Sequence, residues 1–339
     1  MNIRDLGERG LITLIHRLQS MPPLGYIGIG DDAAYLPPSN TGWLISQDML
    51  VESIHFRWDW MTPEQVGFKA VAVNVSDMAA MGGMPKAILT SLSVPATMRV
   101  EVIEDMYRGM TRALDRYGAV LIGGDTVGSP DHLVIDVTVL GTPGPMGPIR
   151  RTGARPGDRL MVSGRLGAAY AGYMLLSHGE MWPSHSVHER SVQVAHIAPA
   201  ARVELGLPLG SMVHALTDIS DGLYAEIEEL TRFGGVGATL FGDTLPIDEA
   251  TRKVARAFRG DPVDYALYGG EDYELLAAVA PSKVTEVLSL GESLGVPVTE
   301  VGVITDDPGI RIVQAGQEVK LNGKRTFNHF RLDRRAEWT

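Results

Sequence analysis

Cysteine is absent from the 339-residue chain. Without thiols the protein can form no disulfide, no thiolate metal site and no cysteine nucleophile. Long apolar runs are also missing, since none approaches the ~18 residues that a membrane-spanning helix needs. The first ten residues, MNIRDLGERG, are charged and lack the apolar core of a secretory signal. We therefore expect a soluble cytoplasmic protein that has no membrane segment.

Positive charge is scarce, with 30 basic against 41 acidic residues and a net charge of −11. This balance argues against a general binder of nucleic acid or of anionic membranes. An anionic substrate would then need metal ions or a local basic patch. The length suits roughly two domains, and the 45% hydrophobic content is ordinary for a globular protein.

Several familiar catalytic signatures do not occur in the sequence. There is no G-x-x-x-x-G-K-[ST] phosphate loop and no HRD or DFG kinase motif. GYIGIG is not a dinucleotide fingerprint, because Ala33 stands where the third glycine is required. A nucleotide enzyme with this sequence must use another fold, in which metals and arginines replace the phosphate-binding loop.

The first half of the chain contains several aspartates with unusually apolar or glycine-rich neighbours. They are Asp31 and Asp32 in GIGDDAA, Asp48 in ISQDML, Asp77 in VNVSDMAAMGG and Asp125 in LIGGDT. Aspartate is rarely buried unless it is paired or holds a cation. Two carboxylates ~4 Å apart cost about 1 kcal/mol in water and about 4 kcal/mol at an effective dielectric near 20. If these residues converge, divalent cations would stabilise the group.

Three metal sites are compatible with such carboxylates. A structural calcium site is disfavoured because the aspartates lie tens of residues apart, unlike an EF-hand. A metallohydrolase is disfavoured because there is no HExxH motif and no closely spaced histidine pair. Several Mg²⁺ ions that bridge a nucleotide fit best, because Mg²⁺ takes one or two carboxylates and shares phosphate oxygens.

The element pattern predicts where these aspartates lie. Thr62-Pro63-Glu64 predicts the start of a helix that runs to about Met81 and is apolar almost all round, with Asp77 on it. Apolar spacing predicts a second helix over 103–117, ended by Gly118. We expect a strand over 43–47 that ends at Asp48, and a turn over 123–126.

The second half alternates helix and strand, which predicts an α+β (α/β two-domain) architecture. The Gly/Pro-rich segment 141–148 is the best boundary between its two domains. Asp218 and Asp221, in TDISDGL, follow a strand over 213–219 and precede a helix over 223–233. For Asp221, capping of that helix is an alternative role, and both roles can coexist.

Seven motifs, in the order GDDAA, ISxDMLVExxHF, AVNVSDMAAMGGxP, LIGGDT, RTGAxPGD, TDISDGL and GGEDYEL, resemble the thiamine-monophosphate kinase family. This family belongs to the superfamily of aminoimidazole ribonucleotide synthetase and selenophosphate synthetase. The resemblance implies an N-terminal domain, residues 1–146, whose sheet forms a homodimer. It also implies a C-terminal α/β sandwich domain, residues 147–339, with ATP in the groove between the domains.

The implied reaction is Mg²⁺-dependent, in-line transfer of the ATP γ-phosphoryl group to thiamine monophosphate, which gives thiamine diphosphate without a phosphoenzyme. Phosphoryl transfer needs positioning and charge neutralisation more than an acid–base pair. The phosphate of the substrate is itself the nucleophile and is ionised at neutral pH. We therefore assign no general base.

The resemblance also implies the roles of individual residues. The implied magnesium positions are Asp32, Ser46, Gln47, Asp48, Asp77, Asp125, Asp218 and Asp221. The implied ATP contacts are Gly124, Asp125, Arg151, Ser220 and Tyr107, whose ring would stack on the nucleotide. The implied substrate contacts are His55, Glu271 and Phe327. Gln47 departs from the family, which usually has threonine there, and this puts one metal ligand in doubt.

Some alternatives stay open at this point. Phe327 and Trp338 would either cover a substrate ring by cation–π contact or pack the tail against the protein. A ligase like aminoimidazole ribonucleotide synthetase is the second enzymatic interpretation, and a non-catalytic nucleotide- or metal-binding relative is the third. Selenophosphate synthetase and the hydrogenase-maturation dehydratase rely on cysteine or selenocysteine, which this chain lacks.

Overall fold

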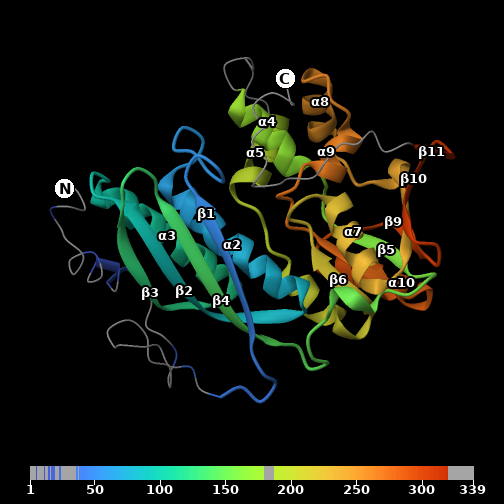
Figure 1. Cartoon of the computed structure of the whole chain (residues 1–339), viewed down its shortest axis with the longest axis horizontal. Coiled ribbons are helices and arrows are strands. Elements are labelled where there is room, and N and C mark those ends of the chain that lie inside the picture. The colour runs from blue at the N-terminus through green and yellow to red at the C-terminus, as the bar shows by residue number, and fades with distance from the viewer. Residues whose placement is uncertain are drawn as a thin grey trace.

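The computed structural model describes residues 38–178 and 187–319, together with residues 5, 11, 14, 15, 17–19, 23 and 36. Two mixed sheets with their helices lie side by side (Figure 1). The first sheet has the strand order β1-β4-β2-β3, and the second has the order β11-β10-β7-β9-β5-β8-β6. The predicted mixture of helix and sheet in two units is confirmed.

The first sheet consists of β1 (Leu44–Val51), β2 (Gly83–Pro95), β3 (Val120–Ser129) and β4 (Val134–Pro143). Helices α2 (Pro63–Ala80) and α3 (Val100–Tyr117) cover one of its faces (Figure 1). Apolar side chains such as Ile45, Met49 and Val127 on these strands are more than half exposed. A sheet of this composition has an apolar surface that its own helices do not cover.

Helix α2 begins as the sequence predicts. Thr62 Oγ1 accepts from the backbone N–H of Gln65, and the Gln65 side chain accepts from the backbone N–H of Thr62 at 2.9 Å. This capping box and Pro63 satisfy donors that the first turn would leave unpaired. The helix ends at Ala80, one residue before the predicted Met81.

Burial of α2 on nearly all sides has a simple cause. The same hydrophobic core contains α2, the first sheet, and residues such as Leu216 and Leu275 of the second sheet. The helix therefore lies between the two sheets (Figure 1). Any polar side chain on α2 must find its partner within this interior.

The second sheet consists of β5 (Arg159–Ser163), β6 (Val213–Asp218), β7 (Gly237–Phe241), β8 (Leu275–Val279), β9 (Val298–Thr305), β10 (Gly309–Gln314) and β11 (Gln317–Val319). Its helices are α4 (Ala168–Ser177), α5 (Val187–Ile197), α6 (Val203–Gly206), α7 (Leu223–Gly234), α8 (Glu249–Ala257), α9 (Pro262–Tyr268) and α10 (Val284–Ser293). On β8, Leu275 and Ala277 join the core around α2, whereas Leu276 and Ala278 join the core beneath α7. This alternation lets one strand bury both faces.

Two local predictions are wrong. Strand β1 continues to Val51, so Asp48 lies within the strand and not at its end. The predicted turn over 123–126 is part of β3. Ile122 is an extra residue there, because Leu121 pairs with Ile88 and Gly123 pairs with Leu89. This bulge bends β3 without ending it.

Candidate functional site

Strand β1 and helix α2 bring two predicted metal residues together. Ser46 Oγ donates a hydrogen bond to Asp77 Oδ2, and the backbone N–H of Asp48 donates to Asn74 Oδ1 at 2.8 Å. Side chains alternate along a strand, so Gln47 has different neighbours from Ser46 and Asp48. Its amide donates to Asp136 Oδ2 at 2.5 Å on the adjacent strand. Gln47 is thus engaged away from Asp77.

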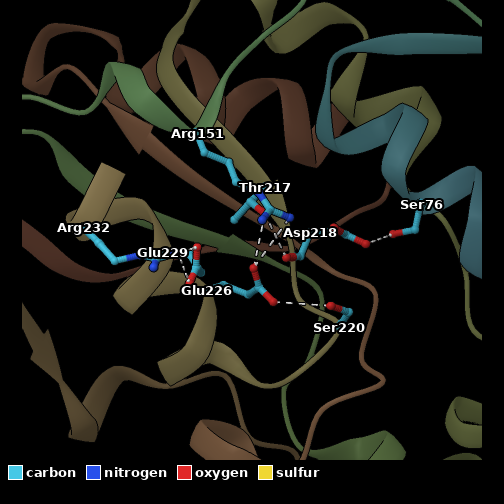
Figure 2. A network of polar contacts seen from close by, with 8 residues as sticks. All are labelled: Ser76, Arg151, Thr217, Asp218, Ser220, Glu226, Glu229 and Arg232. Carbon is cyan, nitrogen blue, oxygen red and sulfur yellow. Dashed lines mark hydrogen bonds and ion pairs between the residues drawn. The ribbon is translucent and has the colours of Figure 1, made fainter. Parts of the chain in front are cut away.

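The second domain adds Asp218, at the end of β6. Ser76 Oγ on α2 donates to Asp218 Oδ2 at 2.6 Å, so this bond crosses between the two domains (Figure 2). Burial, followed by the charge of Asp77, raises the pKa of Asp218 to about 7. Burial and then the charges of Asp77 and Asp221 raise the pKa of Asp48 to about 6. Four predicted metal residues therefore lie close enough to repel one another.

A basic residue lies on the other side of this group. Arg151, in a 3₁₀ turn over Arg151–Gly153, lowers the pKa of Asp77 and of Asp218 against the larger upward effect of burial. Its Nη2 atom is 4.0 Å from Oε2 of the buried Glu226 on α7. Glu226 also accepts from Ser220 Oγ at 3.3 Å (Figure 2). The sequence reasoning missed Glu226, whose only signal was its place on the helix after TDISDGL.

A cavity of about 480 Å³ lies where these elements meet. It is lined by Ile45, Ser46, Asp77, Met78, Ala80, Met81, Ile149, Arg150, Arg151, Thr152 and Leu216. Asp77 and Arg151 thus line the same space, between the two domains. The carboxylate can hold a cation, and the guanidinium beside it can bind phosphate. Together they suit a ligand that consists of a metal ion and a phosphate group.

The donor set fits Mg²⁺. Among the described residues, no group of three histidine, aspartate or glutamate side chains is close enough to hold a metal by itself. Magnesium rarely uses such a cage, because it takes one or two carboxylates and keeps water or phosphate oxygens. Burial is the first cause that raises the pKa values of Asp48, Asp77 and Asp218. When these three carboxylates are ionised, they therefore lack enough positive charge nearby to compensate them.

Glu271 lies beside this site. Its backbone N–H donates to the Ser220 carbonyl oxygen at 2.6 Å, which holds the GGEDYEL segment against TDISDGL. Glu271 Oε1 lies 2.9 Å from Lys69 Nζ, and Oε2 lies 3.0 Å from His196 Nδ1. Neither Lys69 nor His196 was predicted. The signal for Lys69 was a lysine inside an otherwise apolar helix.

The predicted stacking of Tyr107 on the nucleotide is wrong. Tyr107 is 2% exposed in the core of the first domain, and burial raises the pKa of its hydroxyl well above the usual value. The ring is therefore enclosed by protein and is not available to stack on a nucleotide. The alternative capping role of Asp221 is not observed, because Gly222 is the N-cap of α7 and makes no side-chain cap hydrogen bond.

Gly124 and Asp125 lie apart from the group. Asp125 and Gly124 are on β3, which is separated from β1 by two strands, so roughly 14 Å lies between these edges of the sheet. His55 follows β1, and its Nδ1 accepts from the backbone N–H of Val51 at 3.0 Å. Asp32, Phe327 and Trp338 lie outside the described residues.

Comparison with known proteins places the chain among close relatives. Residues 30–142 match the family model "AIR synthase related protein, N-terminal domain", and residues 155–314 match the corresponding C-terminal domain. Thiamine-monophosphate kinase from Bacillus subtilis is 35% identical over 90% of this chain and 94% of its own length. The enzyme of that name from Aquifex aeolicus is 33% identical, with 96% and 100% covered.

Solved structures agree with this grouping. The crystal structure of thiamine-monophosphate kinase from Stenotrophomonas maltophilia K279a has a TM-score of 0.78 at 34% identity and covers 91% of this chain and 94% of its own. The structure of AaThiL complexed with AMPPCP and TMP has a TM-score of 0.76 at 32% identity, with 97% and 99% covered. The hydrogenase maturation protein HypE, at 18% identity and a TM-score of 0.76, shares the fold.

Proposed function

Because this chain belongs to the thiamine-monophosphate kinase family, within the AIR synthase related proteins, we propose that it transfers the γ-phosphoryl group of ATP to thiamine monophosphate. The product is thiamine diphosphate, the reaction belongs to thiamine biosynthesis, and we place it in the cytoplasm. The observation that carries the proposal is the cavity that Asp77 and Arg151 line together.

The chain's own residues provide binding and orientation. Arg151 offers two parallel N–H donors to a phosphate of ATP, and Ser220 lies on the same side. Asp48, Asp77, Asp218 and Asp221 would hold Mg²⁺, with Ser46 orienting Asp77 through its hydrogen bond. When bound, Mg²⁺ neutralises the charge on the phosphates. No residue is needed to remove a proton, because the acceptor phosphate is already ionised.

The test is a product assay. Purified protein is incubated with ATP, Mg²⁺ and thiamine monophosphate, and the mixture is separated by chromatography, with an EDTA control. We expect thiamine diphosphate that forms only with Mg²⁺. Formation of ADP without thiamine diphosphate would refute the proposed acceptor, and full activity in EDTA would refute the role of the carboxylates.

We also propose that two copies pack through the exposed face of the first sheet. Its apolar residues Ile45, Met49 and Val127 favour burial against an apolar partner, and a second copy is self-complementary under two-fold symmetry. A two-fold axis parallel to the strands places β1 of one copy over β3 of the other. The strand that carries Asp125 in one copy would then lie over the strand that carries Asp48 in the other, although two strands separate them within one copy.

Mixing two inactive variants tests this arrangement. If Asp48 and Asp125 act across the interface, then mixed Asp48→Asn and Asp125→Asn dimers contain one intact site. Subunit exchange should recover roughly a quarter of the wild-type activity, because half of the dimers are mixed and each has one working site. No recovery, with exchange shown by native mass spectrometry, would mean that both residues serve the same site within one copy.

A further inference from the structure

Lys69 is fully buried in the middle of α2, between the two sheets. A buried ammonium group is unfavourable unless it is paired with an opposite charge. Glu271 provides that charge, with its Oε1 atom 2.9 Å from Lys69 Nζ. The pair joins a helix of the first domain to a loop of the second, 202 residues further along the chain by the numbering.

The second oxygen of Glu271 is held from another direction. His196 on α5 is 3% exposed, and its Nδ1 lies 3.0 Å from Glu271 Oε2. Burial, followed by the charge of Lys69, lowers the pKa of His196, which favours the neutral ring beside the carboxylate. Burial would raise the pKa of Glu271, but Lys69 and His196 outweigh it and keep the carboxylate ionised.

The backbone at Glu271 is also unusual. Its φ is 59°, a left-handed conformation that residues other than glycine rarely adopt, and Tyr273 has a φ of 51°. Such a conformation persists only when the surroundings hold it in place, and it is common at ligand-binding positions. The bond from the Glu271 N–H to the Ser220 carbonyl oxygen, together with Lys69 and His196, supplies that hold.

Despite these partners, the Glu271 side chain is 30% exposed. Each carboxylate oxygen has two lone-pair directions, so one close partner on each leaves acceptor capacity for a further N–H group. Lys69 already balances the negative charge. The remaining capacity therefore favours a directed hydrogen bond over a salt bridge with a cationic ring.

Aromatic side chains lie next to His196, the residue of α5 that contacts Glu271. The His196 ring lies 6.4 Å from the ring of Trp60 and 5.9 Å from that of Tyr173. Trp60 and Tyr173 contact each other edge to face at 5.7 Å, and Tyr173 is 38% exposed. An acceptor near partly exposed aromatic rings suits a flat heterocycle that carries an N–H donor.

We infer that Lys69 and His196 are positioning residues that present the Glu271 carboxylate to the amino group on the pyrimidine ring of thiamine monophosphate, beside Trp60 and Tyr173. This inference rests on the proposed function and names which part of the substrate Glu271 recognises. The phosphate end of the substrate would then point toward Arg151 and the carboxylates.

The experiment compares thiamine monophosphate with oxythiamine monophosphate, in which oxygen replaces the pyrimidine amino group. The wild type should prefer thiamine monophosphate by roughly 10–100-fold in kcat/KM, because an oxygen opposite a carboxylate leaves both without a donor. Glu271→Gln should reduce or reverse this preference, since a glutamine amide can donate to that oxygen.

Lys69→Met and His196→Phe test the positioning role. Each should raise KM for thiamine monophosphate by roughly 10-fold or more and weaken the preference over the oxygen analogue, with KM for ATP unchanged. Lys283→Met is the matched control, because Lys283 pairs with Glu286 at 2.6 Å on the exposed surface. Lys69→Arg, which keeps the charge, should restore part of the preference.

The outcomes separate the two proposals. If the wild type makes no thiamine diphosphate, the proposed function fails and this inference fails with it. If the wild type is active but folded Glu271→Gln and His196→Phe keep the full preference for the amino group, this inference alone is overturned. A Lys69→Met protein that does not fold leaves the decision to those two variants.

Discussion

Asp77→Asn should make the metal-free protein more stable while it abolishes turnover. The substitution removes one charge from the group that also contains Asp48 and Asp218, and it keeps the size of the side chain. Asparagine Oδ1 can still accept the hydrogen bond that Ser46 donates. The change therefore isolates charge from packing.

The magnitude follows from the electrostatics of the group. Two carboxylates about 5 Å apart repel by ~3 kcal/mol at an effective dielectric near 20. Arg151 offsets part of this repulsion at Asp77. We expect the variant to gain about 1 kcal/mol in the free energy of unfolding without metal, or roughly 2–4 °C in Tm. In the proposed reaction the same charge holds Mg²⁺ beside ATP, so turnover should fall by at least about 10²-fold.

Thermal unfolding with and without Mg²⁺ and ATP, alongside the product assay, measures both effects. The wild type should gain more from Mg²⁺ and ATP than the variant, since stabilisation grows with affinity. Asp131→Asn, a change at an exposed residue between β3 and β4, is the control and should alter neither quantity. A metal-free Asp77→Asn protein that melts below the wild type, or one that gains equally from Mg²⁺ and ATP, would refute the reasoning.

Three further predictions concern pH, phosphate binding and packing. The pKa values of Asp48 and Asp218 are raised to about 6 and about 7, so their contribution to stability is present at low pH and is lost as pH rises through these values. The Tm of the metal-free wild type should therefore fall between pH 5.5 and 8 relative to that of Asp218→Asn. Parallel curves of Tm against pH for the two proteins would contradict this. Arg151→Met should raise KM for ATP by roughly 10-fold or more, since it removes a charged phosphate donor, and should leave KM for thiamine monophosphate nearly unchanged in steady-state kinetics. Gly109→Ala should destabilise the protein by several kcal/mol in urea unfolding, because a methyl group there overlaps the α2 backbone. The control Gly118→Ala, in open space with a φ of 69°, should cost only about 1 kcal/mol. Equal losses of stability would show that the close contact between α2 and α3 is not the cause.

Local chemistry made much of the fold predictable. Thr62 and Pro63 determine where α2 begins, and Gly118, in the left-handed conformation, determines where α3 ends. The apolar surroundings of Asp77 correctly indicated a helix buried on nearly all sides. These features depend on residues only a few positions apart, which a sequence displays directly.

Features that depend on distant pairing were not predictable. Tyr107 belongs to the same apolar stripe of α3 as Met106 and Met110, and this packing decides its environment. The distance of Asp125 from the other aspartates follows from the strand order. The partnership of Lys69 with Glu271 joins two domains, and nothing within either motif indicates it.

The most direct measurement follows the γ-phosphate of labelled ATP in the presence of thiamine monophosphate and Mg²⁺. Our account predicts one labelled thiamine diphosphate for each ADP formed, with the label in its terminal phosphate. It also predicts that Asp77→Asn and Arg151→Met reduce labelling of thiamine diphosphate. Label that appears in inorganic phosphate while thiamine monophosphate stays unchanged would contradict the account.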